Sequence, residues 1–100
     1  MNEFLTRQFL QIQFAISDFR KGELDLNALV RKLEGIGNII EGEFLEERLF
    51  PLVFDLEAIN SELLDKKREL NPSEQEQIRS ILNLLETMLV DLTDSPRREH

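Results

Sequence analysis

The sequence predicts an all-α protein, an antiparallel bundle of four helices, or of five if one further short segment is also helical. Apolar residues recur at spacings of three and four through four long segments, without the alternation of a strand. The polar connections are short, which favours antiparallel neighbours. One hundred residues with 41% hydrophobic content suffice for one core. We therefore predict one domain over residues 1–92 and a disordered tail over 93–100.

The first predicted helix begins at Asn2, a good N-cap residue, and ends at Lys21, before Gly22. At 100° per residue, its core face is formed by Phe4, Leu5, Phe9, Ile12, Ala15, Ile16 and Phe19. Leu10 and Phe14 lie off this face. The helix therefore either packs on two sides or carries an exposed apolar spot.

The second predicted helix covers residues 27–40, with Asn27 as its N-cap. Its core stripe is formed by Leu29, Leu33, Ile36 and Ile40. Gly35 and Gly37 are unfavourable inside a helix, each by about 1 kcal/mol relative to Ala. They indicate either a close approach of another helix or an early helix end.

The third predicted helix covers residues 51–68 and ends in basic residues that suit the negative end of the helix dipole. Residues 43–50 could form a short helix of their own, which Pro51 either kinks or separates from the next helix. The core stripe is formed by Leu52, Leu56, Ile59 and Leu63, with Val53 and Leu64 beside it.

The fourth predicted helix has the clearest start. Asn71, Pro72 and Glu74 supply an N-cap, a proline at the first helical position and a glutamate at the third. The core face runs through residue 92 and is formed by Ile78, Ile81, Leu82, Leu85, Met88, Leu89 and Leu92.

Negative charge is concentrated in one quarter of the chain. The formal net charge is −8, and residues 41–65 hold eight acids against Arg48 alone, a local net charge of −7. Within a Debye length of roughly 8 Å such carboxylates act together on a partner. They repel phosphate backbones and attract a basic protein surface. The alternative is a solvated helix face that keeps a small protein soluble.

We predict that a partner binds at this acidic stretch. The predicted partner-binding residues are Glu41, Glu43, Glu46, Glu47, Asp55 and Glu62, with Phe54 as an apolar anchor. Phe54 lies off the core stripe of its helix, on the side of Ser61 and Asp65, where an exposed aromatic suits an interface. Alternatively, Phe54 belongs to the core and packs beneath residues 41–50.

Composition argues against catalysis. The chain has no cysteine, and its only imidazole is His100, so we predict no thiolate nucleophile, no histidine-based catalysis and no metal site. No phosphate-binding glycine loop is present, and the paired carboxylates have no histidine nearby. We therefore predict that the protein is not an enzyme and needs no cofactor.

Charge and hydropathy also limit the partners and the location. A pI near 4.6 argues against binding nucleic acid or an anionic membrane. Polar residues interrupt the N-terminal apolar residues, so no secretory signal is predicted, and no stretch approaches the roughly 20 apolar residues of a membrane span. We expect a cytoplasmic protein.

The stretch from Phe19 to Ile36, FRKGELDLNALVRKLEGI, joins an aromatic-basic-glycine turn to a helix with a Leu-Glu-Gly pattern. It resembles a recurring segment of small all-α immunity proteins of bacterial contact-dependent growth inhibition and related polymorphic toxin systems. Leu56-Glu57 resembles the Leu-Glu that such proteins often carry on the third helix, although the aromatic that often follows is absent. The resemblance covers about a third of the chain.

The resemblance implies a cytoplasmic protein that binds and neutralises a cognate toxin domain. Many such toxins are nucleases with basic clefts, which an acidic surface can cover. We therefore expect an immunity protein that blocks a basic nuclease domain and is a monomer when free. One alternative is a structural or adaptor protein that self-associates through Leu10, Phe14 or Phe54. Another is a small regulatory subunit of a larger assembly without a toxin partner.

Overall fold

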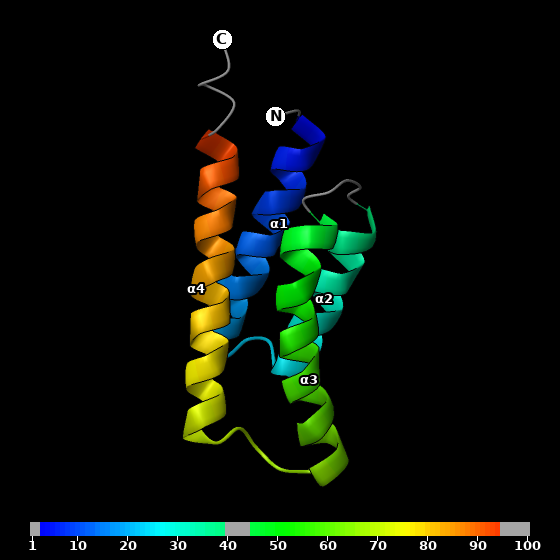
Figure 1. The fold of residues 1–100 in the computed structure, drawn as a ribbon, viewed down its shortest axis with the longest axis vertical. Coiled ribbons are helices and arrows are strands. Elements are labelled where there is room, and N and C mark those ends of the chain that lie inside the picture. The colour runs from blue at the N-terminus through cyan, green and yellow to red at the C-terminus, as the bar shows by residue number, and fades with distance from the viewer. Residues whose placement is uncertain (1–2, 40–44, 95–100) are drawn as a thin grey trace.

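The computed structural model describes residues 3–39 and 45–94, and this part of the chain is all-α, without strands. The helices are α1 (Glu3–Arg20), α2 (Leu26–Ile39), the π-helix η1 (Leu45–Leu49), α3 (Phe50–Lys66) and α4 (Pro72–Asp94). Each α-helix in Figure 1 runs opposite to the one before it. Contacts join α1 to α2, α2 to α3 and α3 to α4, and α4 closes the ring against α1. The predicted all-α fold is confirmed.

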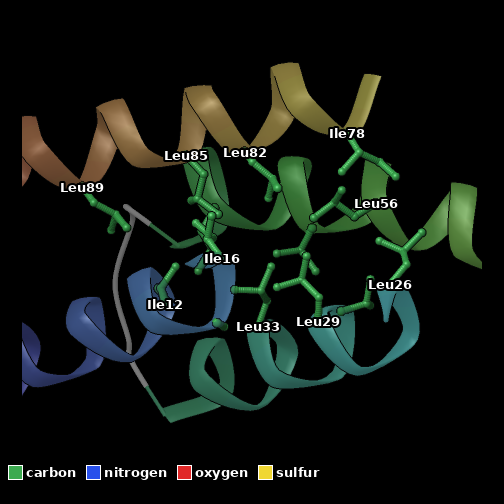
Figure 2. Packing of buried hydrophobic residues seen from close by; sticks show 14 of the residues in the cluster. Ile12, Ile16, Leu26, Leu29, Leu33, Leu56, Ile78, Leu82, Leu85 and Leu89 are labelled. Carbon is green, nitrogen blue, oxygen red and sulfur yellow. The ribbon is translucent and has the colours of Figure 1, made fainter. Parts of the chain in front are cut away.

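All four α-helices contribute to one apolar core. Figure 2 shows Ile16, Leu33, Leu56 and Leu85, one from each helix, pointing into a shared interior. The buried apolar residues are Phe9, Ile12, Ala15, Ile16, Leu26, Leu29, Val30, Leu33, Leu49, Val53, Leu56, Ile78, Leu82, Leu85 and Leu89. Most of these residues follow the predicted 3.6-residue stripes, so the hydrophobic effect accounts for the arrangement of the helices. Leu26, Val30 and Leu49 are buried although no predicted stripe included them.

Two residues that were predicted to lie on or beside the core stripes are exposed instead. Phe4 is 45% exposed, because it lies in the first turn of α1, at the end of the bundle. Leu64 is 57% exposed, because it lies 100° around α3 from Leu63, on the outer side of the stripe. Leu10 and Phe14 are also exposed, so α1 packs on one side and carries an apolar spot on the other.

Backbone hydrogen bonds explain where α1 ends. The amide of Gly22 donates to the carbonyl of Phe19, and that of Glu23 donates to the carbonyl of Asp18. These two bonds form a Schellman motif, which needs a residue with positive φ at its turn. Gly22 has a φ of 82° and meets that need without the strain that a Cβ adds. The predicted stop at Gly22 is confirmed.

The caps of α2 and α4 differ in how well the sequence predicted them. Asp25, rather than Asn27, caps α2, since its Oδ1 accepts a 2.8 Å hydrogen bond from the amide of Ala28. Leu26 is buried and is the first residue of the helix, so the N-cap lies two residues upstream of Asn27. The predicted start of α4 is confirmed. The Glu74 amide donates to Asn71 Oδ1, and the Asn71 amide donates to Glu74 Oε1, at 2.8 and 3.1 Å.

The contact between α2 and α3 depends on a glycine and on a pair of amides. A Cβ at Gly37 would lie 2.9 Å from Cε1 of Phe50, so the glycine allows the close approach. A Cβ at Gly35 would meet nothing within 4 Å. About 15 Å away along each helix, Asn60 is 3% exposed and donates a 2.9 Å hydrogen bond to Oδ1 of Asn27. Asn27 therefore links two helices instead of capping one.

The chain does not break at Pro51. The π-helix η1 runs directly into α3, and Pro51 lies in the first turn of α3. The sequence offered two outcomes at Pro51 but did not predict a π-helix.

The remaining boundaries differ from the predictions by two residues or fewer. Helix α3 covers 50–66 rather than 51–68, and α4 continues to Asp94, so residues 93 and 94 of the predicted tail are helical. Asn2, Ile40 and residues 95–100 lie outside the described residues. None of the described helices combines the length and the apolar character that crossing a membrane requires.

Candidate functional site

The outer face of α3 is the part of the predicted site that the structure places. Core residues Val53, Leu56 and Asn60 occupy one side of this helix. The opposite side, called the α3 outer face below, is formed by Phe54, Asp55, Ala58, Ser61, Glu62 and Asp65, all of them exposed. The helical spacing of 100° per residue explains why these side chains share a face. Three predicted partner-binding residues, Phe54, Asp55 and Glu62, therefore lie together.

Phe54 is a large aromatic side chain open to solvent. It is 62% exposed, the largest value among the exposed large apolar side chains of the described residues. Its ring stacks on the ring of Phe50, with centroids 6.0 Å apart and planes inclined by 17°. Phe50 is half-buried and packs against Gly37, so its ring lies between Phe54 and α2 and supports one face of the Phe54 ring. The ring is thus fixed from one side and not buried beneath the preceding segment.

The carboxylates of α3 differ in how far their charge is compensated. Glu62 Oε1 lies 3.0 Å from Lys66 Nζ and 3.6 Å from Arg68 Nη2. The hydrogen bond from Lys66 and the charges of both bases lower the pKa of Glu62. Asp55 forms no ion pair with any described residue. Asp55 therefore presents an uncompensated charge one residue from Phe54, whereas Glu62 is engaged within the chain.

The other four predicted partner-binding residues precede α3. Glu47 lies in η1 and is exposed. Glu46 belongs to the same π-helix, but the position of its side chain is outside the described part of the structure. Glu41 and Glu43 lie outside the described residues altogether.

Sequence analysis missed a groove between α3 and α4. Its volume is about 700 Å³, and it is lined by Asp55, Ala58 and Ile59 of α3 and by Ser73, Glu76, Gln77, Ser80 and Ile81 of α4. The sequence feature that could have indicated the groove is the presence of small residues next to the core stripes of both helices, Ala58 on α3 and Ser73 and Ser80 on α4. Small side chains leave space between neighbouring helices. We call it the α3–α4 groove.

The described residues contain no arrangement suited to metal-dependent chemistry. Within residues 3–39 and 45–94, no three acidic, histidine or cysteine side chains gather as they would around a metal ion. The α3 outer face offers an aromatic ring and an uncompensated carboxylate, with a groove beside them, which are features that suit contact with a partner. No family model, curated protein or solved structure matches this chain.

Proposed function

We propose that this chain is a binding protein that neutralises a cationic protein domain by covering it with the α3 outer face. In its specific form, the proposal is an immunity protein that blocks a bacterial toxin domain, a nuclease with a basic cleft. The observation that carries it is the adjacency of Phe54, 62% exposed, and Asp55, which has no ion pair with a described residue.

Several acids elsewhere on the described surface are paired within the chain, whereas Asp55 is not, and the exposed aromatic next to it distinguishes Asp55 from other unpaired acids such as Glu69. Glu86 pairs with Arg20, Glu74 with Arg68, and Glu76 with Arg79. A free carboxylate beside an exposed aromatic offers a partner both a charge to pair with and apolar area to bury, the combination found at interface hot spots. The local charge of −7 over residues 41–65 would also steer a basic surface towards this stretch of the sequence.

The proposed mechanism is stoichiometric. The carboxylates would pair with lysines and arginines of the toxin domain and so exclude its phosphodiester substrate. Truncating one member of such a buried pair typically costs about 2–5 kcal/mol of binding free energy, so a few pairs suffice for tight inhibition. The proposal includes no catalysis and no cofactor, and it places a monomer in the cytoplasm until the toxin domain binds.

The test first identifies the reading frame upstream of the gene for this chain, which the proposal expects to encode a large secreted effector, and then measures a binding titration with the C-terminal domain of that effector. We expect Asp55→Lys and Phe54→Ala each to weaken binding by about tenfold or more, about 1.4 kcal/mol. Two matched controls carry the same changes elsewhere. Glu23→Lys alters an exposed acid in the α1–α2 connection, and Phe14→Ala removes an exposed aromatic from α1. The proposal is wrong if Glu23→Lys weakens binding as much as Asp55→Lys, because net charge alone would then explain the effect.

An exposed apolar pair on α1 favours a second candidate, a self-associating structural or adaptor protein. Leu10 and Phe14 are 42% and 57% exposed and lie one helical turn apart, so they form one patch. Sedimentation velocity at micromolar concentration separates the two candidates. The immunity proposal expects a monomer, whereas self-association expects a dimer that Phe14→Ser disrupts.

A further inference from the structure

The α3–α4 groove has the form of a seat for a short helix. Its floor is made by Ile59 and Ile81, both half-buried against the core. Its walls carry small side chains, Ala58 on α3 and Ser73 and Ser80 on α4. Small residues on two neighbouring helices let a third backbone approach closely, while the two isoleucines supply apolar area for it to cover.

The dimensions fix the length of an occupant. Ser73 and Ser80 lie seven residues apart on α4, which corresponds to about 10 Å along the helix axis. Two turns of an α-helix have the same length and present apolar side chains at i and i+4 on one side. Leu84, 57% exposed, follows Ser80 by one turn and extends the apolar surface of α4 beyond the groove.

The charges on the groove determine what kind of chain fits. Asp55 lines the α3 side and Glu76 the α4 side, and none of the described residues that line the groove is basic. Glu76 is paired with Arg79, but both side chains are at least 60% exposed, and such surface pairs are weak enough to exchange for another cation. A second copy of this chain would place like charges opposite one another. An occupant with lysine or arginine on both flanks would meet a carboxylate on each side.

We infer that the α3–α4 groove binds a two-turn amphipathic helix of a cationic partner protein, with apolar side chains on Ile59 and Ile81 and basic side chains against Asp55 and Glu76. This inference rests on the proposed function, since it names the part of the cationic partner that docks beside Phe54. Figure 1 shows that the α3 and α4 ribbons diverge towards the 67–71 connection, and the lining residues define the groove between these two helices.

Two synthetic peptides of about 18 residues provide the probe. Both have the same number of leucines and lysines. One places leucines at i, i+4 and i+7 between flanking lysines, and the other distributes the leucines around the helix. Fluorescence anisotropy at low salt measures their affinity for the full chain. We expect the amphipathic peptide to bind about tenfold more tightly than the permuted peptide, because only the first can place leucines on the isoleucine floor while pairing its lysines.

A pair of matched variants distinguishes groove binding from charge attraction. Ala58→Leu fills the groove, whereas Ser61→Leu adds a leucine to the same exposed face without lining the groove. Both positions are exposed, and circular dichroism verifies that both variants fold. We expect Ala58→Leu to weaken the amphipathic peptide about tenfold and Ser61→Leu to leave it within about twofold of the unmodified chain.

The possible failures have different meanings. Equal binding of both peptides, weakened by Asp55→Lys but not by Ala58→Leu, overturns the groove and leaves the acidic binding face standing. Absence of peptide binding also overturns the groove. If, in addition, the toxin-domain titration does not respond to Asp55→Lys, the proposed function fails with it.

Discussion

Arg68 and Glu74 connect the end of α3 to the first turn of α4 through two parallel hydrogen bonds. Arg68 Nη1 donates to Glu74 Oε1 and Nη2 donates to Oε2, both at 2.8 Å. The same carboxylate also accepts the amide of Asn71 in the capping box of α4. Glu74 therefore fixes both the direction of α4 and its attachment to α3.

These contacts predict an acid-sensitive contribution to stability. The Arg68 guanidinium and the Asn71 amide lower the pKa of Glu74 from 4.5 to about 2. Because the pKa is lower in the folded state, the stabilisation is present above pH 4.5 and is lost as pH falls towards 2. Glu74→Gln should unfold at lower urea concentration than the unmodified chain at pH 7, and the difference should shrink steadily as pH falls from 5 to 2.

Urea titrations across this pH range provide the measurement. Glu69→Gln is the control, because Glu69 is exposed and forms no ion pair with a described residue. A constant difference between Glu74→Gln and the unmodified chain at every pH would contradict the assignment of this carboxylate as the acid-sensitive group.

The two glycines of α2 should respond differently to alanine. Gly35→Ala is expected to raise the free energy of unfolding by about 0.5–1 kcal/mol, because alanine favours the helix and its Cβ meets open space. Gly37→Ala has the same helical advantage but forces its Cβ against the Phe50 ring. We expect it to be at least about 1 kcal/mol less stable than Gly35→Ala, as overpacking costs typically are. Equal stability of the two variants would show that Phe50 moves aside freely.

The end of α3 offers a stabilising substitution. Lys67 has a φ of 52°, in the left-handed region, and the Arg68 amide donates to the Leu63 carbonyl as at a Schellman turn. The left-handed conformation costs an L-residue about 1–2 kcal/mol, which exceeds the entropic disadvantage of glycine. Lys67→Gly should therefore raise the free energy of unfolding by about 0.5–1 kcal/mol, measured by chemical denaturation.

The equivalent turn at the end of α1 supplies the reverse test. Gly22 already occupies the left-handed position there, so Gly22→Ala should lower the free energy of unfolding by about 1 kcal/mol. If both substitutions change stability in the same direction, backbone conformation is not what decides these two positions.

The amide pair between α2 and α3 should show coupling. Asn60 is buried, so Asn27→Ala leaves its side-chain donor without the Asn27 acceptor and should cost about 1–3 kcal/mol. In a double-mutant cycle with Asn60→Ala, the combined loss should be smaller than the sum of the single losses by at least about 0.5 kcal/mol. Thermal or urea unfolding of the four proteins measures this, and additive losses would show that the bond contributes nothing.

The sequence was a good guide to the helices and a weaker guide to what lies between them. Apolar spacing determines which side of a helix turns inward, so the predicted stripe of α4 is correct from Ile78 to Leu89, and the side chain of Leu92, its last predicted member, lies outside the described part of the structure. The Asn71–Glu74 capping box was also predictable, because both partners lie within four residues. Asp25 and Asn27 are both good N-cap residues, so local preference alone does not decide which of them begins α2. The burial of Leu26 within the helix decides in favour of Asp25.

The candidate site was predictable only in part. Spacing places Phe54 and Asp55 on the outer side of α3, but it cannot show whether another element covers them. The pairing of Glu62 with Lys66 could be predicted from their i,i+4 spacing. The position of Arg68 near Glu62 depends instead on the turn that follows α3. The α3–α4 groove depends on the separation of two helices, which no single segment encodes.

The π-helix η1 affects how the surface around Phe54 can change in evolution. A π-helix has the geometry of an α-helix with one residue inserted, and its hydrogen bonds span five residues instead of four. Deleting one residue between Leu45 and Leu49 would restore regular winding and rotate the remaining residues of this segment by about 100° around the axis of α3. A single codon lost at this point would thus re-aim an exposed acid such as Glu47 relative to Phe54 while the residues of α3 keep their places in the interior.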